Sequence, residues 1–199
     1  MSGFMDALLK RRSVYGISSE NTLPDDELKA LLGDIIKNLP TAYNMQGTRM
    51  VLLLGQNHLD FWNDIVLETL RGKTTPDKFP RTQSKIAGFA AGHGTILYFN
   101  DEDVTKQFME ENKNYAENFP PWVLQHNGML QVSVWMVLAE AGMGASLQHY
   151  NPIIDEQVKA RWKLPENWKL LAQMPFGKTV TPAGEKTFVP LEERFKIFE

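Results

Sequence analysis

The spacing of apolar residues in the first third of the chain predicts helix followed by a buried strand. Six apolar residues recur with the i, i+3, i+4, i+7 spacing of one helical face: Leu28, Leu31, Leu32, Ile35, Ile36 and Leu39. Pro24 and the acidic residues after it favour a helix start, and Pro40 marks the end. A short helix is also predicted over residues 3–11. The apolar run at 49–55 predicts a buried strand.

The same alternation of helical and strand patterns continues along the chain. Further helices are predicted over residues 57–71, 82–91, 101–118, 122–141 and 153–163. Strands are predicted over residues 95–99, 145–148 and 169–174, and the tail at 181–199 is expected to end as an edge strand. With no internal repeat and no linker, residues 1–199 are expected to form a single α+β domain in which helices cover a central sheet.

The segment from Met129 to Ala141 is apolar on every side, because ten of its thirteen residues are apolar. A helix of this kind must be buried all round. It either forms the centre of a monomer's core or is shared between the core and a dimer interface. Full enclosure is difficult in a chain of 199 residues, so we favour a homodimer.

Composition and charge narrow the possible functions. Hydrophobic residues make up 43% and charged residues 23%, as in ordinary globular proteins. A net charge of −3 has the wrong sign for general attraction to nucleic acid or an anionic membrane, so neither is expected as a partner. The absence of cysteine excludes disulfides, thiolate catalysis and cysteine-held metals. The N-terminus has no signal-peptide pattern, and a cytoplasmic location is expected.

Several enzyme classes lack their motifs here. There is no P-loop pattern and no G-x-S-x-G. Gly92-His-Gly94 and Gly142-Met-Gly144 lack the third glycine of a dinucleotide fingerprint, and the first pair precedes its strand instead of following it. The four histidines have no metal-ligand spacing, so no metal site is expected.

Three polar segments remain as candidates for binding. Lys10-Arg-Arg-Ser13 closes the first helix; it either complements the helix dipole or offers guanidinium forks and a hydroxyl to a phosphate. Residues 40–46 form a polar break between helix and strand, which fits an ordinary loop. The sequences at 177–178 and 184–186 are compatible with simple turns.

The order and spacing of these segments resemble the FMN-dependent nitroreductase family, and its short, stress-responsive bacterial and fungal subgroup in particular. The likeness covers nearly the whole chain and is carried by RRSVYGIS, NMQGTRMVLL, GFAAGHGTILYF and PFGKTVTPAGEKTF. It implies a nitroreductase-like fold with a central mixed β-sheet covered by helices, an intertwined homodimer, FMN as cofactor and NAD(P)H as electron donor. It implies no catalytic side chain, because the flavin carries the chemistry.

The resemblance also implies which residues bind the cofactor. The FMN phosphate and ribityl chain are assigned to Arg11, Arg12, Ser13 and Lys186. The segment that one subunit offers to its partner's flavin is assigned to Pro40, Thr41, Ala42, Asn44 and Gln46. The strand-loop against the isoalloxazine ring is assigned to Ser146, Leu147, Gln148 and His149. Lys85 is the candidate cation near the flavin N1–O2 edge, and the candidate pocket walls are Tyr43, Trp122, His126 and Tyr150.

Two departures from the family pattern concern the site itself. Gln46 is followed by Gly47 and Thr48 where many members have Pro-Trp, and Phe188 stands where a second basic residue follows the phosphate lysine.

The expected activity is reduction of flat nitroaromatics or quinones by ping-pong hydride transfer through flavin N5. The alternatives are a flavin-binding or ligand-sensing protein with little turnover, and an α+β interaction protein without flavin.

Overall fold

The computed structural model describes residues 2–199 and confirms the α+β class. Its sheet has the order β1 (Gly16–Ser18), β5 (Trp168–Thr181), β3 (Gly94–Asp101) and β2 (Thr48–Leu54), and β4 (Met143–Ala145) also pairs with β5. These strand pairs are antiparallel. An isolated bridge between Ser13 and Ala145 is parallel.

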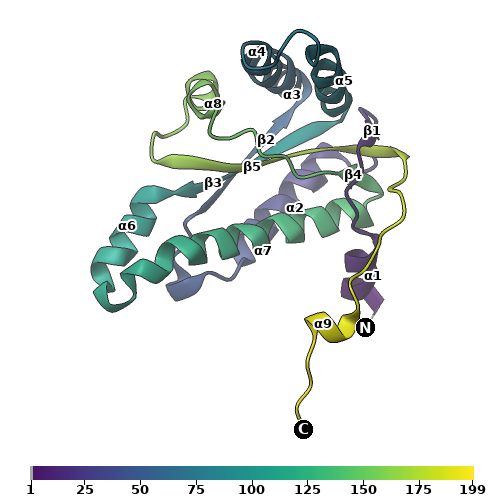
Figure 1. Cartoon of the computed structure of the whole chain (residues 1–199). Helices are drawn as coiled ribbons and strands as arrows, with labels where there is room; N and C mark the ends of the chain where they lie inside the picture. Colours follow the sequence, from purple (N-terminus) through teal and green to yellow (C-terminus); the bar gives the residue numbers. More distant parts are fainter. Residues whose placement is uncertain (1) are drawn as a thin grey trace.

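Helices cover both faces of this sheet (Figure 1). One face carries α2 (Asp25–Asn38) and the long α7 (Phe119–Glu140), together with the core cluster of Leu28, Leu130 and Val134. The other face carries a helical stretch from α3 (Gly55–Asp60) through a π-helix (Phe61–Leu67) to α4 (Glu68–Arg71), then α5 (Phe79–Ala90) and α8 (Asp155–Trp162).

The middle strand β3 explains why both faces can be covered. Ile96 and Tyr98 belong to the core cluster under α2 and α7, whereas Leu97 and Phe99 belong to the cluster under the π-helix, α5 and α8. Successive side chains of a strand point to opposite faces, so an unbroken apolar run requires cover on both sides. Every residue of β3 is buried accordingly.

The long helix α7 is not buried on every side within the chain. Leu130, Val134 and Leu138 are buried at helical spacing, while Leu124 is 61% exposed and Met129 and Val132 are partly exposed. Burial of this helix on every side is therefore not achieved by one chain.

None of the helices in the described residues has the length and hydropathy to cross a membrane.

The remaining elements differ in detail from the predictions. The helix expected at 101–118 is divided into α6 (Glu102–Glu111) and a 3-10 helix (Lys113–Asn118), because Asn112 leaves the helical region with φ −125°. The strand expected at 145–148 ends at Ala145, and beyond it Gln148 forms only an isolated bridge with Gln173. The short β1 and the first helix, α1 (Ser2–Lys10), complete the N-terminal part.

The predicted edge strand at the C-terminus is wrong. After β5 the chain contains a single-turn helix, α9 (Leu191–Arg194), and no strand among residues 182–199. Figure 1 shows this yellow segment passing α1 and ending away from the sheet. Without a neighbouring strand the tail has no ladder to join, and Phe198 is 93% exposed.

Candidate functional site

The segment after α1 lies directly beside the end of β4. Ser13 forms the parallel bridge with Ala145, and the Val14 N–H donates to the Ala145 carbonyl at 2.9 Å. This pairing places residues 11–13 next to residues 146–149, although more than 130 positions separate them in the sequence. Two of the predicted cofactor segments are thus adjacent in space.

The C-terminal segment is attached to the same place through Arg12. Its Nη2 donates to the Gly184 carbonyl at 2.7 Å, which brings residues 184–186 to the Arg11–Ser13 segment. The Arg11 guanidinium lies 4.6 Å from the centre of the Trp135 ring on α7. Lys186 is exposed and sits 5.1 Å from the Phe188 ring.

Among the described residues, these three cations have no carboxylate partner. Within residues 2–199, the ion pairs do not include Arg11, Arg12 or Lys186. Their neighbour Lys10, in contrast, pairs with Glu140 at 3.0 Å. A group of unneutralised cations beside an exposed Ser13 is suited to an anionic ligand such as a phosphate.

Residues 146–149 are held by β5 through alternate residues. The Ser146 N–H donates to Pro175 at 3.3 Å, and Gln148 exchanges two backbone hydrogen bonds with Gln173 at 2.7 and 2.9 Å. Ser146 and Gln148 are buried, whereas Leu147 is half-buried and His149 is exposed. Alternate residues of an extended chain direct their backbone groups to opposite sides, so Leu147 faces away from β5.

Gln173 is a site residue that the sequence analysis missed. Its side chain is fully buried, accepts from the Tyr150 N–H at 2.7 Å and donates to the Asn151 side chain at 3.1 Å. A single polar residue inside the apolar run of β5 was the signal that could have found it. Through these bonds Gln173 fixes the chain that follows His149.

Lys85 and Tyr150 lie at the edge of the same region. The Lys85 ammonium is 5.8 Å from the centre of the Tyr150 ring, and the Trp62 ring meets Tyr150 edge-on at 5.9 Å. Burial raises the pKa of Tyr150 to about 12, so its hydroxyl keeps its proton at neutral pH. The structure therefore brings an exposed cation close to residues 146–150.

The polar segment at 40–46 has an unusual backbone. A 3-10 helix at Ala42–Asn44 contains Tyr43 and Asn44, both with φ 53°, and Gln46 follows with φ 49°. Side chains with a Cβ rarely adopt this left-handed region. Such conformations persist only where surrounding contacts enforce them, and they cluster at functional sites.

Two contacts attach the ends of this segment to the body of the protein. The Ala42 N–H donates to Nε2 of His126 at 2.8 Å, and Arg49 donates to the Gln46 carbonyl at 2.7 Å. Arg49 also pairs with Asp101 at 2.8 Å. Burial lowers the pKa of His126, whose side chain is only 5% exposed.

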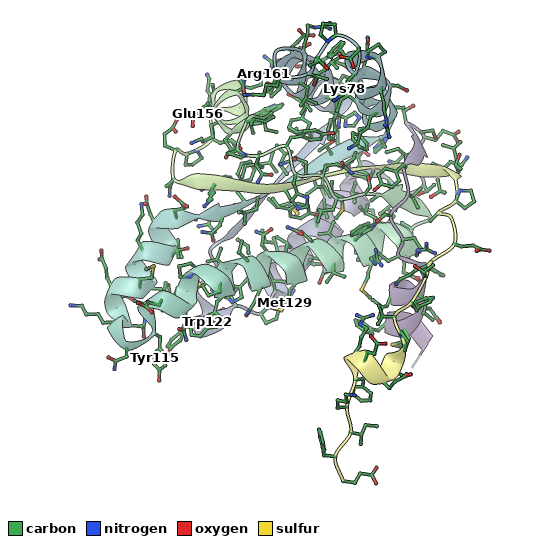
Figure 2. The ribbon with its side chains drawn as sticks, viewed as in Figure 1. Lys78, Tyr115, Trp122, Met129, Glu156 and Arg161 are labelled. Atoms are coloured by element: carbon green, nitrogen blue, oxygen red, sulfur yellow. The ribbon has the colours of Figure 1, made fainter. Side chains whose placement is uncertain are left out.

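Tyr43 extends from the segment into a group of aromatic rings. Its ring centre lies 5.7 Å from Phe119, 6.2 Å from Trp122 and 6.5 Å from Tyr115, and Tyr43 remains 53% exposed. Figure 2 shows Tyr115 and Trp122 at the amino-terminal end of α7, far from the C-terminal tail. These partly open rings could flank a flat ligand.

The predicted site residues therefore form two separate groups within one chain. The first contains Arg11–Ser13, Lys85, residues 146–150 and Lys186, and the second contains residues 40–46 with Trp122 and His126. Their contacts on α7, at Trp135 and His126, are nine residues apart, or about 13 Å along a helix. No group of three potential metal ligands occurs in the described part of the chain.

Comparison with known proteins identifies close relatives. The Nitroreductase family model matches residues 8–178. A "putative nitroreductase HBN1" of Saccharomyces cerevisiae is 30% identical over 190 residues, which is 94% of this chain and 93% of the yeast protein.

Several solved structures similar to this chain are also nitroreductases. Nitroreductase CinD from Lactococcus lactis in complex with nicotinic acid is 40% identical, with a TM-score of 0.92 over 98% of this chain and 100% of CinD. CinD has also been solved with chloramphenicol and with 4-nitrophenol. A nitroreductase with bound FMN from Desulfitobacterium hafniense shares the fold over 100% of both chains, with a TM-score of 0.71 at 17% identity.

Proposed function

The chain belongs to the nitroreductase family, and from this premise we propose that it binds FMN and uses it to reduce flat aromatic compounds with electrons from NAD(P)H. The observation that carries the proposal is the hydrogen bond from Arg12 to Gly184, which joins the segment of Arg11 and Arg12 to that of Lys186; none of these three cations is neutralised by a carboxylate within residues 2–199. Two guanidinium groups and an ammonium, with the Ser13 hydroxyl beside them, suit the phosphate of FMN.

The residues beyond the phosphate group also fit a flavin. The Leu147 backbone, turned away from β5, is available to approach the isoalloxazine ring, while Ser146 and Gln148 keep this strand-loop attached to the sheet. Lys85 near Tyr150 can place positive charge at the N1–O2 edge. A fixed cation there favours negative charge on that edge without any reorganisation of the protein.

Residues 40–46 complete the site from a second subunit in this proposal. Within one chain they are attached at His126, about 13 Å along α7 from the residue that Arg11 contacts. The family resemblance assigns them to the partner's flavin. A homodimer formed over the exposed apolar residues of α7 would supply each flavin with residues from both chains.

When bound, FMN supplies hydride transfer through N5, from NAD(P)H to an oxidant. The chain's own residues orient the reactants and exclude water. Tyr43, Trp122, His126 and Tyr150 are the proposed walls of the substrate site. CinD is solved with nicotinic acid and with 4-nitrophenol, and small rings of this kind, nitroaromatics or quinones, are the substrates we propose here. Because the cytoplasm holds the NAD(P)H pool, we propose that the protein acts there.

The decisive experiment is FMN titration of the purified protein, followed by anaerobic addition of NADH or NADPH. A yellow protein that bleaches and is re-oxidised by 4-nitrophenol or a quinone supports the reductase. A yellow protein that does not bleach favours a flavin-dependent sensor, which needs the same binding residues but no turnover. A protein that does not bind FMN contradicts both.

A further inference from the structure

We propose that His126 is a positioning residue, whose hydrogen bond to Ala42 holds residues 41–46 in the conformation that they present to the partner's flavin. The proposal rests on the proposed function, because the FMN site of a dimer is what gives this segment a ligand. It assigns His126 a role through the backbone of residues 41–46, in addition to its proposed place in the wall of the substrate site.

The segment requires such support because of its backbone. Tyr43, Asn44 and Gln46 account for three of the four non-glycine residues with positive φ in the described chain. Each residue of this kind costs on the order of 1–3 kcal/mol. Three of them within four positions would relax to other conformations unless contacts on both sides of the segment fixed its ends.

His126 supplies the contact at the start of the segment. Its Nε2 lies 2.8 Å from the Ala42 nitrogen, and a backbone N–H can only donate. Nε2 must therefore be without a proton, so the ring is neutral and carries its proton on Nδ1. Burial of the side chain on the inner side of α7 favours the same neutral form.

The other end and the interior of the segment are fixed independently. Arg49 holds the Gln46 carbonyl from β2, and the Gln46 N–H donates to the Thr41 hydroxyl at 3.1 Å. Charged and titratable groups in contact with the segment include the Arg49–Asp101 ion pair at its end and Tyr115, whose ring lies beside that of Tyr43. His126 is thus the connection between the first residue of the strained turn and α7.

A pair of substitutions separates this role from simple packing. In His126→Gln the amide oxygen can still accept the Ala42 N–H at nearly the same distance, whereas His126→Met has similar length and no comparable acceptor. Loss of the buried acceptor should weaken FMN binding roughly 5- to 100-fold in His126→Met, and His126→Gln should restore most of it. Gln157→Met, at an exposed position of α8 on the opposite face of the sheet, serves as the control and should bind FMN as the unaltered protein does.

Amide hydrogen exchange over residues 40–47 provides a second measurement that needs no flavin. Exchange should accelerate in His126→Met and stay near the original rate in His126→Gln and Gln157→Met. Equal FMN affinity in all variants, or a loss in His126→Gln as large as in His126→Met, would overturn the proposal. Failure of the proposed function has a different signature, since the unaltered protein itself would then not bind FMN.

Discussion

The Nδ1 atom of His58 lies 2.8 Å from the Thr95 hydroxyl, and the same hydroxyl lies 2.7 Å from the indole nitrogen of Trp62. The other imidazole nitrogen is 3.2 Å from the Ala90 carbonyl, which can only accept. These partners fix one arrangement of protons: Trp62 donates to Thr95, Thr95 donates to His58, and Nε2 of His58 donates to Ala90. In this arrangement His58 is neutral, and the network joins α3, β3 and α5.

The first prediction concerns stability in acid. Burial lowers the pKa of His58 from 6.5 to about 4, so the unfolded chain binds a proton more readily than the folded chain does. The stabilisation is complete above pH 6.5 and is lost as the pH falls from 6.5 towards 4. It amounts to about 3 kcal/mol, and urea unfolding across this range measures it.

A comparison with His58→Asn isolates this effect from other titrations. The variant should be less stable than the original protein at pH 7, and the difference between the two should narrow as the pH approaches 4. A constant difference from pH 7 to pH 4 would show that His58 does not titrate in this range.

The second prediction concerns the cofactor phosphate. Charge-assisted hydrogen bonds contribute about 1.5–3 kcal/mol, so Arg11→Ala or Lys186→Ala should weaken FMN about 10- to 150-fold. Lys10→Ala removes a neighbouring cation that already pairs with Glu140, and it should leave FMN affinity unchanged. Fluorescence titration of the apo-protein measures all three, and an equal loss in Lys10→Ala would mean that only general positive charge matters.

Much of the fold could be predicted because it depends on regular patterns. The apolar positions of α2 and the unbroken run of β3 each permit one kind of element, and both were found within a few residues of their ends. The three-residue β1 was not predicted, and the strand predicted in the C-terminal tail is not present. Both errors arise because a strand needs a neighbouring strand, and a single sequence does not show which segments pair. The tail has the composition of a strand but no partner strand in this chain.

The family resemblance assigned residues to the candidate site, but the backbone conformation of the segment at 40–46 could not be predicted from the sequence. The resemblance assigned Arg11, Arg12 and Lys186 to the cofactor phosphate, and this role stays a prediction; the structure brings their segments together through the Gly184 contact. The left-handed conformations of Tyr43 and Gln46 oppose the local preferences of these residues. Only tertiary contacts from α7 and β2 impose them, and a single sequence does not reveal such contacts.

The third prediction tests the homodimer. Leu124, Met129 and Val132 leave an apolar strip on α7 exposed to solvent in one chain. Val132→Asp would place a charge within a dimer interface and should convert the protein to monomers at low micromolar concentration. Ile153→Asp, at a similarly exposed apolar position before α8, is the control and should remain dimeric. Sedimentation equilibrium distinguishes the species, and an unaltered protein that is already monomeric would contradict the prediction.

The fourth prediction concerns kinetics. The chain has no dinucleotide fingerprint that could hold NAD(P)H at a separate site, so donor and oxidant are expected to occupy the same position in turn. Double-reciprocal plots should therefore give parallel lines, and high concentrations of a nitroaromatic should compete with NAD(P)H. Intersecting lines without this inhibition would indicate two distinct sites.

The last prediction concerns Gln173, the buried residue that fixes the chain after His149. Gln173→Met keeps the length of the side chain and leaves the Tyr150 N–H without its acceptor, at a cost of about 1–3 kcal/mol. The released Tyr150 should also shift relative to Lys85, so the KM for a nitroaromatic should rise more than FMN affinity falls. Gln107→Met, on the exposed side of α6, controls for the substitution itself. A variant that loses stability without any change in KM would limit Gln173 to a structural role, because the position of Tyr150 would then have no effect on the substrate.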